Sequence, residues 1–179
     1  VESADVAYEG FNQNMKTRAV DWASDGYIRD TTEKLAAADG REREKLAGQL
    51  SDYFRTKKII YDPSIMMVEV LDGKGIVVAS SRPERIGANE AQERNRFNEA
   101  IAGNWGEVFI ENVVFEKDED AERFMNHVTT RIFSISFTLE NPRPLPAVLL
   151  LHYVNTDQLK AVLVGGGGEE KDVKGHTLV

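Results

Sequence analysis

The stretch that decides the fold is residues 68–87, which read VEVLDGKGIVVASSRPERIG. Two runs rich in β-branched residues flank Asp72-Gly73-Lys74-Gly75, and glycine in so short a connection favours a tight turn. The pattern predicts a β-hairpin with strands over Ile65–Leu71 and Ile76–Ser81. Arg82-Pro83 ends the second strand, because proline has no backbone N–H to donate to a sheet.

The sequence before the hairpin has a helical pattern. Apolar residues three or four positions apart mark one helix face: Tyr8, Phe11, Met15, Ala19 and Trp22. We expect one long helix from Glu2 to about Thr32, bent at Gly26, with Trp22 in the core. A second helix is expected from Arg41 to Lys57, so residues 1–60 are predicted to form an N-terminal helical pair.

Four further elements are expected after the hairpin. They are a short helix within Ala88–Ala102 and strands over Val108–Phe115, Arg131–Leu139 and Ala147–Val154. The acidic run Glu116–Glu122 is interpreted as a solvated hairpin loop. Because residues 147–154 are almost without polar interruption, we expect this strand near the middle of the sheet, covered on both faces. Residues 61–164 are thus predicted to form an antiparallel sheet module.

The end of the chain has a different composition. Four consecutive glycines at 165–168 have no side chains to pack and leave the backbone free, as in a linker. Residues 165–179 are therefore expected to be a Gly-rich linker and a truncated tail. We interpret the chain as a fragment of a longer protein.

Composition excludes several classes of protein. The 30 acidic residues outnumber the 22 basic ones, and a net charge of −8 argues against a nucleic-acid partner. No cysteine is present, which removes disulfides, thiolate nucleophiles and Cys-ligated metals. The three histidines, His127, His152 and His176, lack the i, i+4 spacing of a metal site. We therefore expect no metal and no cofactor.

Motifs of catalysis are also missing from the sequence. Ser80-Ser81 lacks the flanking glycines of a nucleophile elbow. Gly73-Lys74-Gly75 is too short for a phosphate-binding loop and lies within the predicted hairpin. The chain is not expected to be an enzyme.

The longest apolar run, Pro146–Val154, is shorter than a membrane-spanning helix requires.

The order of these elements resembles that of Cache sensor domains, the extracytoplasmic PAS-like modules of prokaryotic histidine kinases and chemoreceptors. The best local match is the stretch at 68–87, with its Asp-Gly hairpin, small residues at the end of the next strand and a following Ile-Gly. The segments DWASDGYIRD at 21–30 and FNEAIAG at 97–103 are similar to other parts of such domains. The resemblance covers about Ala4–Val164 and implies an α+β, PAS-like fold, with the long N-terminal helix packed on a five-stranded antiparallel sheet.

The resemblance also implies a function. It is that of an extracytoplasmic domain that binds a small molecule and passes a conformational change through its N-terminal helix to a membrane-bound signalling protein. The full-length protein is then expected to be membrane-anchored, and a homodimer through the N-terminal helix is possible. The tyrosine, arginine and tryptophan pattern of amino-acid-binding double Cache domains is absent, so an amino-acid ligand is not implied.

In a PAS-like fold, the segment between the second and third strands crosses one face of the sheet and is called the crossover segment. The sheet face under this segment can form a ligand cavity. The residues expected there are Arg82, Trp105, Phe109, Arg131, Ser134 and Ser136. Arg82 or Arg131 would hold a carboxylate through two hydrogen bonds, and the serines would add donors and acceptors. Trp105 or Phe109 would form a wall of the cavity. The expected ligand is therefore polar or anionic.

Each of these interpretations has an ordinary alternative. The two aromatic residues would equally serve as core, and the two serines would equally face solvent. Arg82 would be a surface residue at a strand end, and Arg131 would pair across strands with Glu69 or Glu111. His152 is interpreted as a buried histidine with satisfied partners rather than a ligand or pH sensor. The alternative for the whole chain is an interaction or dimerisation module with a side-chain-filled pocket, and a third possibility is a cytoplasmic PAS domain.

Overall fold

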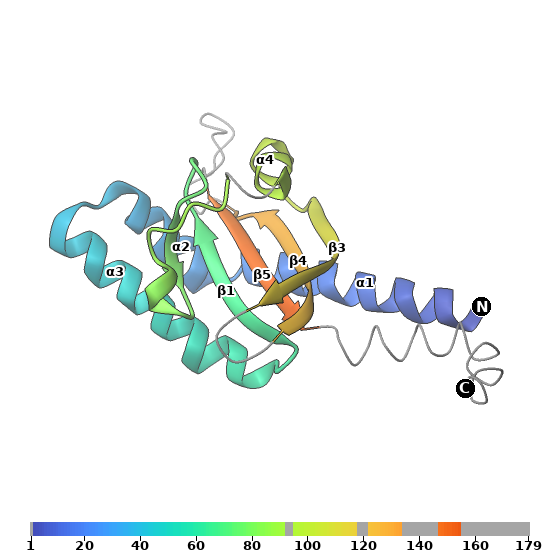
Figure 1. Ribbon diagram of the computed structural model, residues 1–179. Helices are drawn as coiled ribbons and strands as arrows, with labels where there is room; N and C mark the ends of the chain where they lie inside the picture. Colours follow the sequence, from blue (N-terminus) through green and yellow to red (C-terminus); the bar gives the residue numbers. More distant parts are fainter. Residues whose placement is uncertain (1, 92–94, 118–121, 134–146, 155–179) are drawn as a thin grey trace.

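The computed structural model describes residues 2–91, 95–117, 122–133 and 147–154. Its elements, in chain order, are α1 (Glu2–Ala23), α2 (Gly26–Ala37), α3 (Gly40–Tyr53), the helical turns η1 (Phe54–Lys58) and η2 (Ile59–Tyr61), β1 (Ile65–Leu71), β2 (Val77–Ser80), the turn η3 (Pro83–Arg85), α4 (Asn95–Ala102), β3 (Val108–Lys117), β4 (Glu122–Arg131) and β5 (Val148–Val154). The described strands form one antiparallel sheet in the order β2-β1-β5-β4-β3 (Figure 1). The predicted α+β class and the central place of the last strand are confirmed.

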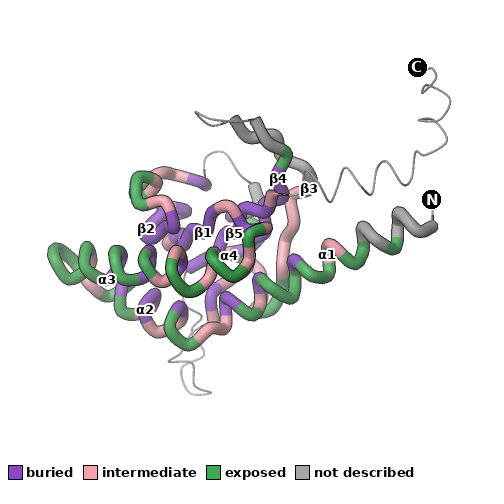
Figure 2. Tube along the Cα trace, turned by 90° about the horizontal axis from the view of Figure 1, so that it is seen from below, coloured by how far each residue is buried: buried purple, intermediate pink, exposed green. Residues whose placement is uncertain are grey.

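The sheet lies between two unequal helical layers. α1, α2 and α3 cover one face, and α4 covers part of the other (Figure 1). The larger apolar core lies under the three N-terminal helices, where Met15, Trp22 and Leu50 are buried against strand residues such as Val70 and Leu151. The expected packing of the long N-terminal helix on the sheet is therefore confirmed. Towards its N-terminus α1 extends past the sheet (Figure 2). Val6, in this part of the helix, is 69% exposed.

The N-terminal helix ends earlier than expected. α1 stops at Ala23 and α2 begins at Gly26, so the prediction of one helix bent at Gly26 is wrong. Asp25 stands between the two helices, and its carboxylate accepts a 2.9 Å hydrogen bond from the backbone N–H of Ile28. An aspartate in this place starts a new helix, because it satisfies one of the unpaired N–H groups of the first turn. The predicted core position of Trp22 is confirmed, since its side chain is buried.

The predicted hairpin is confirmed, with its first strand at the expected bounds. β1 pairs antiparallel with β2, which is one residue shorter at each end than expected. In the turn, one carboxylate oxygen of Asp72 accepts hydrogen bonds from the backbone N–H groups of Lys74 and Ile76, at 2.8 and 3.0 Å. Gly75 has φ +85°, and a Cβ there would lie 2.5 Å from the Cβ of Ala91. Only glycine fits this position without displacement of the neighbouring backbone.

The fourth strand differs from its prediction. It spans Glu122–Arg131, and residues 132 and 133 already lie outside it, so the expected strand over 131–139 is wrong in its placement. Residues 134–139 fall outside the described part of the chain. The expected loop at 116–122 is also too long, because Lys117 pairs with Glu122 across the β3–β4 ladder. Polar side chains along β4 concealed the strand, since they are buried through hydrogen bonds: the Thr130 hydroxyl donates to the Glu107 carbonyl oxygen at 2.8 Å.

Two further sequence expectations bear on how the chain is divided. The predicted linker and tail at 165–179 lie outside the described residues, and the proposed boundaries at 60/61 and 164/165 stay predictions. None of the helices in the described ranges is long and apolar enough to cross a membrane.

Candidate functional site

The sheet face under α4 is divided into an apolar and a polar half. Side chains alternate between the two faces along a strand, so every second residue of β1, β4 and β5 points to the α4 side. The buried apolar residues beneath α4 are Leu71, Val77, Phe97, Ala100, Val148 and Leu150. Glu69 of β1 lies on the same face, because the register sets it opposite Leu150. The polar half begins at this glutamate.

Four titratable residues form a row across the polar half: Glu69, His152, His127 and Glu111. The carboxylate oxygen Oε1 of Glu69 lies 3.3 Å from Nε2 of His152. The ring of His152 meets the ring of His127 edge to face, with centroids 4.6 Å apart. Nδ1 of His127 lies 3.4 Å from Oε1 of Glu111. We call these four side chains the titratable row.

Arg85 binds the carboxylate at the buried end of the row. Its Nε donates to Oε2 of Glu69 at 2.8 Å, and its Nη2 forms an ion pair with Glu90. Burial by itself raises the pKa of Glu69, but the hydrogen bonds and charges of His152 and Arg85 outweigh it, so the pKa is below its usual value. Arg85 thereby ties the crossover segment after β2 to the sheet.

Arg131 lies at the other end of the strands, under the end of α4. Its Nη1 donates a 3.0 Å hydrogen bond to the carbonyl oxygen of Gly103. Its Nε is buried and has no hydrogen-bond partner among the described residues, and desolvation lowers the pKa of the guanidinium. The alternative pairing of Arg131 with Glu69 or Glu111 is wrong, because within the described ranges those carboxylates contact Arg85 and the histidines.

The other predicted site residues are distributed unevenly. Phe109 packs beside the apolar cluster, and its ring atom Cε2 would lie 3.1 Å from a Cβ at Gly103, the residue that Arg131 contacts. Trp105 stacks on Phe133, with ring centroids 5.7 Å apart. Arg82 follows the end of β2, where Ser80 pairs with Glu69, and so lies towards the opposite end of the strands from Arg131. Ser134 and Ser136 lie outside the described residues.

Sequence reasoning missed the titratable row and Arg85. Each of its members stands alone in the sequence, flanked by residues of other types. The one signal available in the sequence was a titratable residue within an otherwise apolar strand, as at Glu69 and His152. Within the described ranges, no group of three or more His, Asp or Glu is arranged to hold a metal ion.

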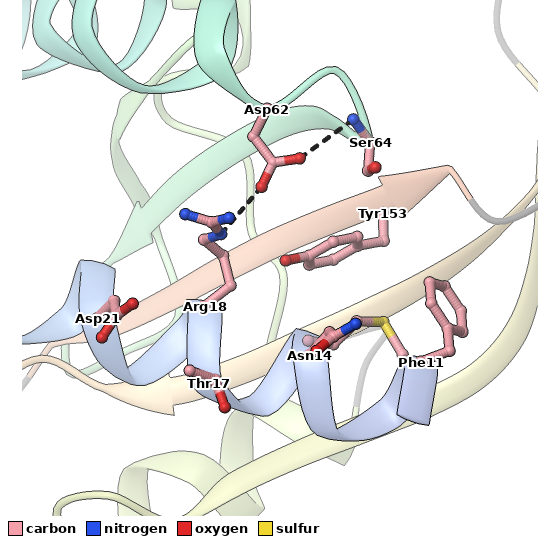
Figure 3. Close-up of a pocket in the computed structure, with 9 residues that line it drawn as sticks. Phe11, Asn14, Thr17, Arg18, Asp21, Asp62, Ser64 and Tyr153 are labelled. Carbon is pink, nitrogen blue, oxygen red and sulfur yellow. Dashed lines mark hydrogen bonds and ion pairs between the residues drawn. The ribbon is translucent and has the colours of Figure 1, made fainter. Parts of the chain in front are cut away.

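A separate hollow of about 410 Å³ lies on the helix-covered side, between α1, the approach to β1 and β5. Its lining residues are Phe11, Asn14, Met15, Thr17, Arg18, Asp21, Asp62, Ser64 and Tyr153 (Figure 3). Nε of Arg18 pairs with Oδ2 of Asp62 at 2.9 Å, and the other oxygen of Asp62 accepts a 3.3 Å hydrogen bond from the Ser64 backbone. Burial raises the pKa of the Tyr153 phenol beside this pair. The opposed charges of Arg18 and Asp62 neutralise each other, so we regard the hollow as a connection between helix and sheet.

Comparison with solved structures supports the fold assignment. The chain is similar to the sensor domain of the V. cholerae histidine kinase DctB, with a TM-score of 0.61 and 14% identity over 87% of this chain and 53% of that one. It is similar to the E. coli DcuS sensor domain, with a TM-score of 0.54 and 16% identity over 88% of this chain and 98% of that one. The ligand-binding domain of the C. jejuni chemoreceptor Tlp3, solved with 4-methylisoleucine, gives a TM-score of 0.51 and 12% identity over 90% and 57% of the two chains.

These likenesses confirm the PAS-like, Cache-type fold predicted from the sequence. At 12–16% identity they establish the fold alone. The chain spans between 53% and 57% of the length of several of the solved sensor domains. No protein-family model matches the sequence. No curated protein matches it either.

Proposed function

We propose that the chain is an extracytoplasmic sensing domain that binds a small anionic molecule on the α4 face of its sheet. The observation that carries the proposal is the state of Arg131, a desolvated guanidinium to which the described residues offer no carboxylate. The fold supports the sensing role, because its solved neighbours are sensor or ligand-binding domains.

The geometry of Arg131 suits an anion. Its Nη1 is engaged by the Gly103 carbonyl, which orients the guanidinium and leaves the adjacent pair Nε and Nη2 for another acceptor. A carboxylate accepts two parallel hydrogen bonds from such a pair. A buried donor without a partner costs about 1 to 3 kcal/mol. An anion that accepts a hydrogen bond from Nε of Arg131 would remove this cost.

Phe109 and the remaining predicted residues complete the proposed site. Phe109 supplies its apolar wall, since it lies beside Gly103 and the cluster under α4. Trp105 is proposed as a second wall, and Ser134 and Ser136 as hydroxyl donors that follow Arg131 in the chain. Arg82, towards the other end of the strands, is kept as a separate anion contact.

A path from this site to the signalling helix follows from the sheet. α1 packs on β3, β4 and β5 from the opposite face, so a ligand that favours one arrangement of these strands also favours one position of α1. A ligand shifts two existing states only by the difference in its affinity for them. In the full-length protein, α1 would pass the displacement to a membrane-bound histidine kinase or chemoreceptor and would provide a homodimer contact.

The test is a thermal-shift screen of the purified domain against acetate, succinate, malate, citrate and phosphate, with glycerol and putrescine as neutral and cationic contrasts. A carboxylate should raise the midpoint in a concentration-dependent way. Arg131→Ala should abolish this effect, and Arg131→Lys should retain only part of it, because lysine cannot bind bidentately. Arg41→Ala, which removes an exposed arginine of α3, is the matched control. Stabilisation that survives in Arg131→Ala contradicts the proposed anchor.

One observation favours a second candidate function. On the α4 face, the buried apolar cluster and the Glu69–Arg85 pair fill space that a ligand would otherwise occupy. The chain would then be an interaction or dimerisation module without a ligand. A screen without any stabilising compound, together with a dimer in sedimentation that dissociates on substitution of Val6 by glutamate, would support this second function.

A further inference from the structure

The titratable row crosses four adjacent strands of the sheet without a gap. Glu69 comes from β1, His152 from β5, His127 from β4 and Glu111 from β3. The register sets His127 directly opposite both His152 and Glu111, so the two rings and the second carboxylate share one level of the sheet. The proximity of these four groups depends on strand pairing alone, because they are far apart in the sequence.

The row is buried at one end and reaches solvent at the other. The side chains of Glu69, His152 and His127 are 0%, 3% and 2% exposed, whereas that of Glu111 is 34% exposed. Histidine is the side chain whose charge ordinarily changes between about pH 5 and 8. The row therefore runs from a partly exposed carboxylate to groups that the rest of the face encloses.

The charges around the row favour the first proton and oppose the second. Among the described residues, the charged groups that contact the row or its arginine include the carboxylates of Glu69 on β1, Glu111 on β3 and Glu90 in the crossover segment, and the cation Arg85. With both imidazoles neutral, these described groups carry three negative charges against one positive. An imidazolium next to a carboxylate is stabilised, but two imidazolium rings at 4.6 Å repel each other.

Other charged groups lie further along the same face. Arg131 is on β4 but nearer the opposite end of the strand, and Glu99 is an exposed residue of α4. The helices α1, α2 and α3 pack against the other face of the sheet.

We propose that the domain senses protons in addition to its ligand, and that the row Glu69–His152–His127–Glu111 is the proton-binding site. Because the two imidazole rings are in contact, a positive charge on one opposes a positive charge on the other. This inference goes beyond the proposed anion sensing and does not depend on it.

The crossover segment is the element that this protonation would move. Glu69 is shared, with Oε1 facing His152 and Oε2 bound to Arg85. A charge on His152 competes with Arg85 for this carboxylate, and Arg85 also holds Glu90. Loosening or tightening of Arg85 therefore shifts the segment that leads into α4, which itself packs on β3, β4 and β5. A local charge change then acts on a packed element, as in other pH-responsive proteins.

The experiment is an NMR titration of the histidine rings between pH 8.5 and 4.5 in the absence of carboxylate ligands. We expect the His127 and His152 signals to titrate over a broad, two-step range, and the amide signals of Arg85 and Glu90 to shift with the same midpoints. His176, the third histidine of the chain, is assigned with His176→Gln, which should leave the other two titrations unchanged.

Substitutions test the coupling. His127→Gln should convert the His152 titration to a single step and raise its midpoint, because the repelling imidazolium is gone. Glu111→Gln, at the partly exposed end of the row, removes the carboxylate that lies 3.4 Å from Nδ1 of His127 and should therefore change the His127 titration. Glu44→Gln, an exposed residue of α3, is the matched control and should leave both titrations unchanged.

Two results would overturn the proposal. One is the absence of titration of both rings across the whole pH range, and the other is an unchanged His127 titration in Glu111→Gln. The anion proposal is tested by a different variant. Arg131→Ala should retain the histidine titrations while it loses carboxylate-dependent stabilisation. His127→Gln should retain the carboxylate-dependent stabilisation while it changes the His152 titration.

Discussion

Arg18 and Asp62 join the first helix to the start of the first strand, with Nε of the arginine 2.9 Å from Oδ2 of the aspartate (Figure 3). The Asp62 carboxylate also accepts a hydrogen bond from the Ser64 backbone, directly before β1. The buried phenol of Tyr153, near the end of the central strand, lies in the same hollow. This pair is therefore a direct polar connection between the helix proposed to carry the signal and the strands that it covers.

Loss of this connection should cost little stability. Arg18→Ala should lower the free energy of unfolding by no more than about 1 kcal/mol, because the arginine side chain is 44% exposed and exposed pairs contribute little. Asp62→Asn should cost more, since it also weakens the contact with the Ser64 backbone. Urea unfolding of both variants beside Arg41→Ala measures this. A loss in Arg18→Ala several times larger than expected would show that the pair is structural rather than a modest link.

Among the N-caps in the described part of the chain, Asp25 should contribute most to stability. It accepts hydrogen bonds from the Ile28 backbone at 2.9 Å and the Tyr53 hydroxyl at 3.0 Å, and it pairs with Lys58 at 2.8 Å. Asp25→Ala should therefore destabilise the domain by about 1 to 2 kcal/mol in urea unfolding. Asp39→Ala is the matched control, because the Asp39 side chain makes no cap hydrogen bond at the start of α3. Equal losses in the two variants would contradict the assignment.

The same aspartate should make stability depend on pH. Burial raises the pKa of Asp25, but hydrogen bonds from Lys58, Ile28 and Tyr53 outweigh it, so the folded pKa is below the ordinary 3.8. A carboxylate with a lowered folded pKa contributes stability that is fully present above its unfolded pKa and disappears as the pH falls through the folded value. The unfolding free energy should fall less steeply below pH 4 in Asp25→Asn than in the wild type. Parallel pH profiles would refute this contribution.

Glu69 should be the costliest to neutralise of the glutamates whose burial the structure describes. It is fully buried and bound by Arg85 and His152, and removing one partner of a buried ion pair typically costs about 3 to 5 kcal/mol. Its folded pKa lies below the ordinary 4.5, so its contribution is present above that pH and is lost as the pH falls further. Glu69→Gln should therefore be strongly destabilised at pH 7, and the loss should become smaller as the pH falls below 4.5, as measured by urea unfolding. Glu44→Gln should be neutral at both, and a small loss for Glu69→Gln at pH 7 would contradict the burial argument.

Gly75 should tolerate no side chain. In Gly75→Ala the new Cβ meets the Ala91 Cβ at 2.5 Å and the backbone is held at φ +85°, so strain and a clash add up. Gly87→Ala is the matched control, because Gly87 has φ +98° but open space around its Cβ position. We expect Gly75→Ala to lose clearly more unfolding free energy than Gly87→Ala. Equal losses would show that the Ala91 segment yields freely.

Local patterns were sufficient for much of the fold. The β1 strand and its turn followed from β-branched runs around Asp72-Gly73-Lys74-Gly75, because a turn of this kind needs only residues close in sequence. The central place of β5 followed from its lack of polar residues. The break at Asp25 was missed, since an aspartate within an apolar helical pattern is also compatible with an unbroken helix.

The fourth strand and the site needed distant partners. The polar residues of β4 do not have the pattern of a buried strand. They are buried because they form hydrogen bonds to β3 and to the loop before it, such as the one from Thr130 to Glu107. Arg131 was identified as a candidate, but its lack of a carboxylate partner among the described residues became visible only when Glu69 was found bound to Arg85.

The amino-acid sequence by itself determined the helical character of the N-terminal part, the β1–β2 hairpin and the buried central strand, because apolar periodicity and turn chemistry act over a few residues. The tertiary structure alone decided which charges meet. Glu69, Glu111, His127 and His152 stand isolated along the chain, and only the register of β1, β5, β4 and β3 brings them within contact distance. Pairing between strands is a long-range choice, and a slip of one residue would turn each of these side chains to the opposite face.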